Sequence, residues 1–505
     1  MGHVPDHATS PAVPEADASF SVAAALRSPR RLRTEVFAGL VVALALIPEA
    51  IAFSIIAGVD PRLGLFASFT MAVTIAIVGG RPAMISAATG AVALVIAPVA
   101  REHGIDYFIA TVILAGVIQV ALGLLGVAKL MRFIPRSVMV GFVNALAILI
   151  FTSQLPHLID VPWLVYPIVA VGLLVMVLLP RLTTVVPAPL VAIVLLTGAT
   201  IIAAVKVPTV GDEGELPESL PSLLFPDVPL TFETLQIIAP FALAMALVGL
   251  LESLLTAKLV DDVTDTHSNK TREAWGQGVA NVVTGFFGGM GGCAMIGQTM
   301  INVKVSGART RISTFLAGVF LLILVVGLGD VVAIIPMGAL VAVMIMVSVG
   351  TFDWHSVKPA TLRAMPKSET AVMLSTVVVT VATHNLAYGV IVGVLVAMVL
   401  FARRVAHLTT VTRLDSSDED GERVYAVEGE LFFASSNDLV YQFDYAGDPD
   451  RVVIDLSRAH VWDASTVAAM DAIATKYAAR GKTAVFVGMN PDSEARHRRL
   501  AGSLS

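Results

Sequence analysis

The chain has 505 residues, of which 56% are hydrophobic and 14% are charged. Soluble globular domains carry about 25% charged residues, so this composition excludes a soluble protein and indicates an integral membrane protein. The formal net charge of −6 says little about partners, and the single cysteine, Cys293, excludes an intramolecular disulfide.

The first 35 residues are polar, rich in Pro and Ala, and have no apolar core of the signal-peptide type. Arg27, Arg30, Arg31 and Arg33 come directly before the first apolar span. Because basic residues concentrate on the cytoplasmic side of membrane helices, we expect residues 1–35 to form a cytoplasmic tail.

Fourteen apolar segments follow, most of them near the roughly 20 residues that a helix needs to cross the bilayer. The predicted spans are 37–59, 63–79, 83–100, 107–127, 137–156, 161–179, 185–205, 236–258, 275–290, 292–304, 310–327, 329–348, 369–383 and 385–402. Loops after even-numbered spans are basic, as in the stretch with Lys129, Arg132 and Arg136, whereas loops after odd-numbered spans hold only Arg62 and Arg101 and, in the longest, Lys206. With both termini inside, this asymmetry follows the positive-inside rule. It predicts an all-α membrane domain of 14 spans over residues 36–405.

One long, acidic, Pro-rich loop at about 206–235 divides these spans into seven plus seven. An odd number of spans per half gives the halves opposite orientations, which is an inverted repeat. Two short matches agree with this order: residues 43–50 with 246–253, and A-M-I-S (83–86) with A-M-I-G (294–297).

The stretch from Gly288 to Ser313 is too Gly-rich and too polar for a plain membrane helix. Its four glycines at 288, 289, 291 and 292 precede a short apolar run that ends at Lys304. We expect the chain to enter the membrane unwound here and to become helical only near the middle. Non-helical backbone at that depth survives where it is buried in protein or lines a cavity, and broken helices point to the binding sites of transporters. The plainer alternative is a flexible helix end at the surface.

Two carboxylates, Glu49 and Glu252, lie near the middle of apolar spans. A charged side chain there costs roughly 2.5 to 3.5 kcal/mol on insertion scales, so such residues usually face the protein interior and serve function. We expect them to bind a coupling cation, H⁺ or Na⁺. Pro48 is expected to break the first span and free a carbonyl, and Thr256 adds a hydroxyl one turn after Glu252. The alternative is a protonated carboxyl bonded to a neighbouring helix.

The third span opens with small residues, Ser86 to Ala91, and includes the hydroxyl of Thr89. If the third and tenth spans are both half-helices, their N-termini face each other across the repeat axis. Each helix N-terminus carries about half a positive charge. Two of them total about one unit, which suits one anion and hardly suits a cation.

Composition changes again after Arg404, where a hydrophilic linker, 406–421, leads into residues 422–505. The segment V-Y-A-V-E-G-E-L-F-F is expected to form a strand pair. A buried strand, an amphipathic helix closed by Gly481 and a further strand follow it, and this order predicts a parallel βαβ unit in a small α/β domain.

These motifs together resemble the SulP family of sulfate permeases and anion transporters over about residues 35–490. The resemblance rests on P-E-A-I-A-F (48–53), S-A-A-T-G-A (86–91), G-Q-T-M-I-N (297–302), S-G-A-R-T-R (306–311) and V-V-I-D-L-S-R-A-H-V-W-D-A-S-T (452–466), the last being diagnostic of a STAS domain. It implies inverted repeats, a core domain that moves against a gate domain, a homodimer, and an anion site between spans one, three, eight and ten. Substrate-binding residues are then expected at Glu49, Phe53, Ala88, Thr89, Gly90, Ile296, Gly297, Gln298 and Thr299, and cation-coupling residues at Glu49, Glu252 and Thr256, the last two also forming the candidate Na⁺ site.

Three departures from the family pattern bear on mechanism. Many members carry Gln at the position of Glu49 and Arg at the position of Gln298. In regulatory STAS proteins the phosphorylated serine follows an aspartate, whereas here Ala464 follows Asp463. The first two departures remove about two units of positive charge near the site, and the third means that the resemblance does not carry the phosphorylation switch to this chain.

We therefore predict a secondary active transporter of bicarbonate, sulfate or a dicarboxylate that works by alternating access as an H⁺ or Na⁺ symporter in the plasma membrane. The expected partners are the anion, the coupling cation, the lipid bilayer, a second copy of the chain and a cytoplasmic protein that binds the STAS domain. The rivals are a nucleobase permease of the same architecture, an uncoupled anion channel and a STAS-linked membrane sensor. No cofactor, nucleic-acid binding, ATP hydrolysis or enzymatic activity is expected, because the sequence has no P-loop and no nucleophile–base or metal constellation.

Overall fold

The computed structural model describes residues 21–129, 134–182, 187–406, 409–414 and 422–502. Arg132, most of the predicted tail and linker, and the last three residues therefore lie outside the described part of the chain. The chain divides into two compact units, 1–393 and 394–505, and each is described by itself. The division falls inside a helix, α17 (Leu386–Ala406), a little before the boundary predicted at residue 405.

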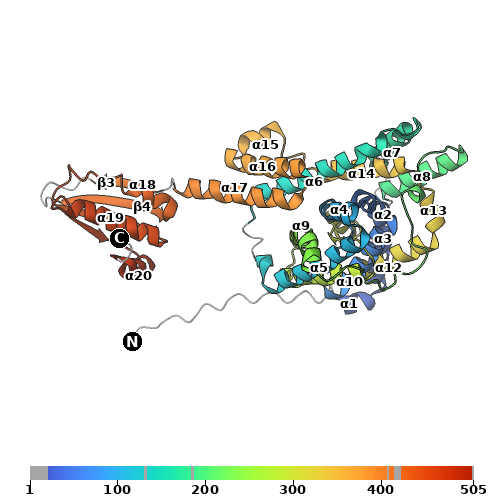
Figure 1. The fold of residues 1–505 in the computed structure, drawn as a ribbon, viewed down its shortest axis with the longest axis horizontal. Coiled ribbons are helices and arrows are strands. Elements are labelled where there is room, and N and C mark those ends of the chain that lie inside the picture. Colours follow the sequence, from blue (N-terminus) through green and yellow to red (C-terminus); the bar gives the residue numbers. More distant parts are fainter. Residues whose placement is uncertain (1–20, 130–133, 183–186, 407–408, 415–421, 503–505) are drawn as a thin grey trace. The chain divides into compact units, whose positions relative to one another are not determined.

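The first unit is built from helices (Figure 1) and contains one very short pair of strands. In chain order, the elements of its first half are α1 (Val22–Leu26), α2 (Pro29–Ala57), α3 (Pro61–Val78), β1 (Ser86–Ala87), α4 (Gly90–His103), α5 (Ile105–Leu124), α6 (Arg136–Gln154), η3 (Leu155–Leu158), α7 (Val165–Leu182) and α8 (Ala188–Ile202). Those of its second half are η4 (Val210–Asp212), α9 (Phe232–Thr264), α10 (Lys270–Phe286), β2 (Cys293–Ala294), α11 (Ile296–Met300), a π-helical turn η5 (Ile301–Val305), α12 (Arg311–Gly327), α13 (Gly329–Ala333), α14 (Met337–Thr351), α15 (Pro359–Ala364), α16 (Lys367–Thr383) and α17.

Every predicted span overlaps a helix of the structure. Among the described residues, seven helices are long and apolar enough to cross a membrane, and three shorter apolar helices have 10 to 17 residues. The protein is thus a multi-pass membrane protein, while the count of fourteen crossings stays a prediction.

Two of the predicted spans are wrong in detail. Helix α2 starts at Pro29, inside the predicted tail, and continues through Pro48, because a helix tolerates one missing hydrogen bond when its neighbours hold it on both sides. The span predicted at 329–348 is two helices, α13 and α14, because Pro336 cannot donate the backbone bond that would continue α13. The tenth span agrees with its prediction, since the chain becomes helical only at Ile296, with five α-helical residues followed by the π-helical turn.

The helices of the first unit pack in two groups. In the core group, α10 lies against α3 and α5, and α12 lies against α2 and α3. Helix α9 packs on α5, and α4 and α11 both pack on α2 and α9, so these three belong to the same group. In the gate group, α16 lies against α6, and α14 lies against α6 and α7 (Figure 1). Buried residues of both groups, such as Phe53 of α2, Phe142 of α6 and Val343 of α14, belong to one continuous hydrophobic cluster.

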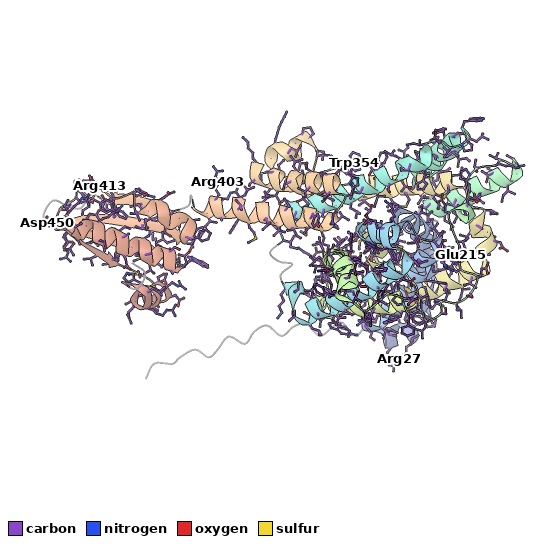
Figure 2. All side chains as sticks on the ribbon, in the orientation of Figure 1. Arg27, Glu215, Trp354, Arg403, Arg413 and Asp450 are labelled. Carbon is purple, nitrogen blue, oxygen red and sulfur yellow. The ribbon has the colours of Figure 1, made fainter. Side chains whose placement is uncertain are left out.

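The long loop between α8 and α9 touches both groups. Thr209 pairs with Pro336 of the gate group in an isolated β-bridge. Further along, Glu215 (labelled in Figure 2) forms an ion pair with Arg62 at the start of α3, and the Leu224 N–H donates to the carbonyl of Phe286 at 2.7 Å. The loop is therefore fixed to the protein at several points despite its length.

The second unit contains a four-stranded sheet in the order β3-β4-β5-β6. The strands are β3 (Thr410–Leu414), β4 (Glu422–Leu431), β5 (Arg451–Val461) and β6 (Thr483–Val487), and the helices are α18 (Phe433–Leu439), α19 (Ala464–Ala478) and α20 (Pro491–Leu500). Strand β4 runs antiparallel to β3 and parallel to β5, and β5 runs parallel to β6. The predicted βαβ unit is confirmed. The predicted strand pair at 424–433 is wrong, because β4 is a single strand and its antiparallel partner, β3, lies inside the predicted linker 406–421.

A buried polar cluster closes the core of this second unit. Asp448 accepts hydrogen bonds from the hydroxyls of Tyr477, at 2.6 Å, and Tyr425, at 3.0 Å. Burial, together with the bond to Asp448, raises the pKa of Tyr477 far above its ordinary value, and burial raises the pKa of Tyr445 to about 12. The neutral phenols are therefore part of the folded state.

Candidate functional site

The site is organised around the two-residue strands β1 and β2. They pair antiparallel, with Ser86 opposite Ala294 and Ala87 opposite Cys293. Helix α4 starts three residues after β1, and α11 starts two residues after β2. Because the strands are antiparallel, the two helices leave the pair in opposite directions, as inverted repeats require. Ser86 and Cys293 are the first residues of β1 and β2 and so hold equivalent positions in the two halves. The sequence match of 83–86 with 294–297 sets Ser86 against Gly297 instead, so it is out of register with the structure.

The backbone before β2 is unwound, as predicted from its glycines. Gly288 and Gly291 have φ values of 67° and 73°, in the left-handed region that glycine adopts without strain. Gly292 lies against the backbone of β1, so that a Cβ atom built on it would be 1.9 Å from the carbonyl oxygen of Ala87. The strand pair therefore needs glycine at position 292.

A cavity of about 400 Å³ lies where the two helices begin. Its core-group wall comes from α2, α4, α9 and the α11–η5 segment, and consists of Glu49, Phe53, Thr89, Gly90, Ala91, Glu252, Met295, Ile296, Gly297, Gln298 and Ile301. Its gate-group wall comes from α6 and α14, and consists of Phe142, Val143, Leu146, Ile150, Val347, Gly350 and Thr351. The N–H groups in the first turn of a helix have no partner within that helix, so both helix starts offer donors at this cavity.

Two buried carboxylates are the only charged side chains on the described cavity wall. Glu49 on α2 is 7% exposed and is hydrogen-bonded by the side chain of Gln298. Glu252 on α9 is 8% exposed and accepts a hydrogen bond from the thiol of Cys293 at 3.0 Å. The same sulfur lies 3.1 Å from the hydroxyl of Thr89. The cavity thus combines the positive ends of two helices with two negative side chains.

The structure brings most of the predicted residues together at the cavity. Three do not lie on its wall. The Ala88 N–H donates to the hydroxyl of Ser68, and the Thr256 hydroxyl donates to the carbonyl of Glu252 at 2.8 Å. Thr299 accepts a hydrogen bond from the backbone N–H of Ile85 at 3.0 Å. Thr299 therefore connects the third and tenth spans, and the Na⁺ role of Glu252 with Thr256 stays a prediction.

Sequence reasoning missed the whole gate-group wall. Its side chains are apolar apart from Thr351, and nothing in the sequence distinguishes them from other residues that pack between helices. It also missed the buried polar face of α10, formed by Glu273, Gln277, Asn281 and Thr284. A signal for that face was present, because these residues recur at helical spacing in a segment with few large apolar side chains.

The cavity can hold a small solute that contacts backbone N–H donors at one side and apolar side chains at the other. An anion fits the helix ends, but a carboxylate at 49 or 252 must then be neutralised. Among the described residues, no group of three or more His, Cys, Asp or Glu side chains is placed to hold a metal ion.

Comparison with known proteins gives a family for this arrangement. Residues 32–165 and 161–376 match the model of the sulfate permease family, and residues 413–501 match that of the STAS domain. The putative sulfate transporter YbaR of Bacillus subtilis is 53% identical over 470 residues, which cover 93% of this chain and 97% of YbaR. The bicarbonate transporter BicA of Picosynechococcus is 28% identical over 498 residues, which cover 88% and 86% of the two chains.

Two solved structures of transporters have the same fold as this chain. The transmembrane domain of a cyanobacterial bicarbonate transporter BicA has a TM-score of 0.64 at 26% identity and covers 72% of this chain and 98% of that domain. The murine anion transporter Slc26a9 shares the fold, with a TM-score of 0.79 at 16% identity over 93% and 87% of the two chains. The family model spans most of the first unit, and more than half of the positions aligned with YbaR are identical: the chain belongs to the sulfate permease family of membrane transporters and carries a C-terminal STAS domain.

Proposed function

We propose that this protein is a secondary active transporter that carries a small anion across the plasma membrane together with a cation, H⁺ or Na⁺. The observation that carries the proposal is the cavity itself. Two helix starts meet there, two buried carboxylates face it, and its described wall holds no Lys, Arg or His.

The charge balance of this cavity is the argument for coupling. The two helix ends together supply about one positive unit, which one anion already balances. Repulsion between unit charges about 4 Å apart is about 4 kcal/mol even at an effective dielectric constant of about 20. An anion beside Glu49 and Glu252 is therefore bound well only when one or both carboxylates have taken up a cation. This dependence makes the cation a co-substrate.

The substrate class follows from the relatives. YbaR is named a putative sulfate transporter and BicA a bicarbonate transporter. We propose bicarbonate, sulfate or a dicarboxylate for this chain, held by the backbone at Thr89 and Gly90 and at Gly297 and Gln298, with Phe53 as an apolar wall. A cytoplasmic location of both termini, homodimer formation and a cytoplasmic partner of the STAS domain belong to the same proposal.

The test is uptake of labelled sulfate, bicarbonate and fumarate into proteoliposomes under an imposed proton or sodium gradient. We expect saturable uptake of at least one anion against its gradient, driven by one of the two cations. Glu252→Gln should abolish the drive by that cation, because an amide binds neither H⁺ nor Na⁺ as a carboxylate does. Uptake that ignores both gradients would contradict symport.

The rival functions give different results in the same vesicles. A channel passes anions only down their gradient and does not saturate in the same way as a carrier. A nucleobase permease takes up labelled uracil in preference to all three anions. A sensor gives flat traces with every solute.

A further inference from the structure

Helix α10 carries a row of polar side chains that are completely buried. Glu273, Gln277, Asn281 and Thr284 are all 0% exposed. Their spacing of four, four and three residues places them on one face of the helix. Burying a polar group without a partner costs several kcal/mol in apolar surroundings, so each of these side chains is expected to have a hydrogen-bond partner nearby.

Their partners lie on the non-helical segments beside the cavity. Glu273 accepts hydrogen bonds from the N–H groups of Gly80, at 2.7 Å, and Arg81, at 2.9 Å. Gln277 donates to the hydroxyl of Ser86 on β1 at 2.6 Å. Glu273 and Gln277 therefore fix the segment that leads into the third span. The segment that leads into the tenth span is bound by Asn281.

Asn281 makes the closest connection to the tenth span. Its Oδ1 accepts from the N–H of Gly292 at 2.8 Å, and its Nδ2 donates to the carbonyl of the same residue at 3.0 Å. Nδ2 also donates to Oε1 of Gln119 on α5 at 2.8 Å. Gln119 in turn donates to the carbonyl of Ala246 on α9. One amide thus holds both backbone polar groups of Gly292 and ties them to three packed helices.

Gly292 is the point at which this restraint reaches the anion site. It is the residue before β2, and its backbone lies directly against Ala87 of β1. The next residue, Cys293, bonds the carboxylate of Glu252. A glycine-rich segment has many accessible backbone conformations, so one conformation is populated only if something outside the segment selects it.

We propose that Asn281 is a positioning residue of the anion site. By holding both backbone groups of Gly292, it fixes the β1/β2 pair and with it the separation of the starts of α4 and α11. It acts through Gly292 and does not touch the anion. This inference rests on the anion-transport function proposed above.

The test compares Asn281→Asp and Asn281→Ala with Thr284→Val, all in the full-length protein. Asp keeps the shape of the side chain and the acceptor for the Gly292 N–H but loses both Nδ2 donations. Ala loses all three hydrogen bonds. Thr284→Val is the matched control, because Thr284 is equally buried on the same face and its hydroxyl lies 2.7 Å from that of Thr70. Its methyl group and carbonyl contact Gly289, and valine keeps both, so the substitution removes a buried hydroxyl without removing a bond to Gly292. Uptake is measured with whichever of sulfate, bicarbonate and fumarate the wild-type protein transports.

We expect KM to rise about tenfold in both Asn281 variants, the order given by one lost buried hydrogen bond that stabilised only the binding-competent conformation. Thr284→Val should keep KM within about twofold of wild type while lowering the melting temperature. A rise in KM that is equal in Thr284→Val would reduce Asn281 to a general stabilising role and overturn the proposal.

The single cysteine provides a second measurement that needs no transport. Cys293 is fully buried beside Gly292, so release of the segment should speed its alkylation by N-ethylmaleimide about tenfold in the Asn281 variants at temperatures where they stay folded. Unchanged alkylation in both Asn281→Asp and Asn281→Ala would contradict the proposal. If the wild-type protein transports none of the anions, the proposed function fails, while alkylation still decides whether Asn281 positions the segment.

Discussion

Gly292→Ala is the sharpest perturbation of the site that the structure offers. The φ of Gly292 is not in the left-handed region, so alanine meets no backbone strain there, and its effect comes from contact alone. The added Cβ would lie 1.9 Å from the Ala87 carbonyl oxygen and 2.6 Å from its carbon. Ordinary contact begins at 3.4 Å, so β1 and β2 must separate by 1.5 Å. A misplacement of about 1 Å in a binding site costs about 100-fold in rate.

We therefore expect Gly292→Ala to reduce anion uptake in proteoliposomes by about 100-fold while the protein still inserts and elutes as the wild type does. Gly288→Ala is the control. Gly288 has a φ of 67° and no atom within 4 Å of a built Cβ, so alanine there costs about 1 to 2 kcal/mol of backbone strain but pushes on nothing. Normal uptake by Gly292→Ala, or an equal loss in Gly288→Ala, would refute the idea that the strand pair sets the geometry of the site.

Two further predictions concern the cavity and the STAS domain. Gly297 lines the cavity, and a Cβ on it meets nothing within 4 Å. We expect the methyl group of Gly297→Ala to reduce the space for the larger anion, so that the KM of fumarate rises about 10- to 200-fold and more than that of bicarbonate. Gly198→Ala, equally open on α8, should change neither KM. Burial raises the pKa of Tyr445 to about 12 and also raises that of Tyr477. Their neutral forms therefore stabilise the folded domain fully below about pH 10, and this effect is lost as pH rises toward 12. The absorbance change removed by Tyr445→Phe and Tyr477→Phe should appear only as circular dichroism reports unfolding; if these two substitutions remove ionisation near pH 10 in the folded protein, the assignment is wrong.

Hydrophobic length and basic loops were sufficient to locate the helices of the membrane unit. The Gly-rich stretch also predicted the unwound entry to the tenth span, because glycines at 288 and 291 take backbone conformations that other residues avoid. The break predicted at Pro48 was wrong, because a proline inside a well-packed helix does not end that helix. The strand register was missed because a two-residue strand has no periodicity to read.

The apolar wall of the cavity could not be predicted for a different reason. Phe142 and Leu146 of α6 and Val347 of α14 look like ordinary packing residues, and only the three-dimensional arrangement places them opposite the helix starts. The polar face of α10 was readable, because Glu273 and Asn281 belong to a regular series. Hydropathy works against that reading, since α10 has 17 residues and its polar side chains leave it out of the shorter apolar helices.

The distribution of polar groups on the two walls explains how such a site can move. Glu49, Thr89, Glu252 and Gln298 all come from the core group, whereas the gate group contributes apolar side chains and Thr351. Apolar contacts are non-directional, so under the proposed function one wall could slide along the other while the polar groups proposed to bind the anion stay together on the core group. Buried hydrogen bonds link α5, α9 and α10 to the segments before α4 and α11, so we expect the proposed recognition geometry to be kept if the core group moves. A transporter built in this way keeps its ligand contacts within one rigid group and leaves the interface between the groups free to change.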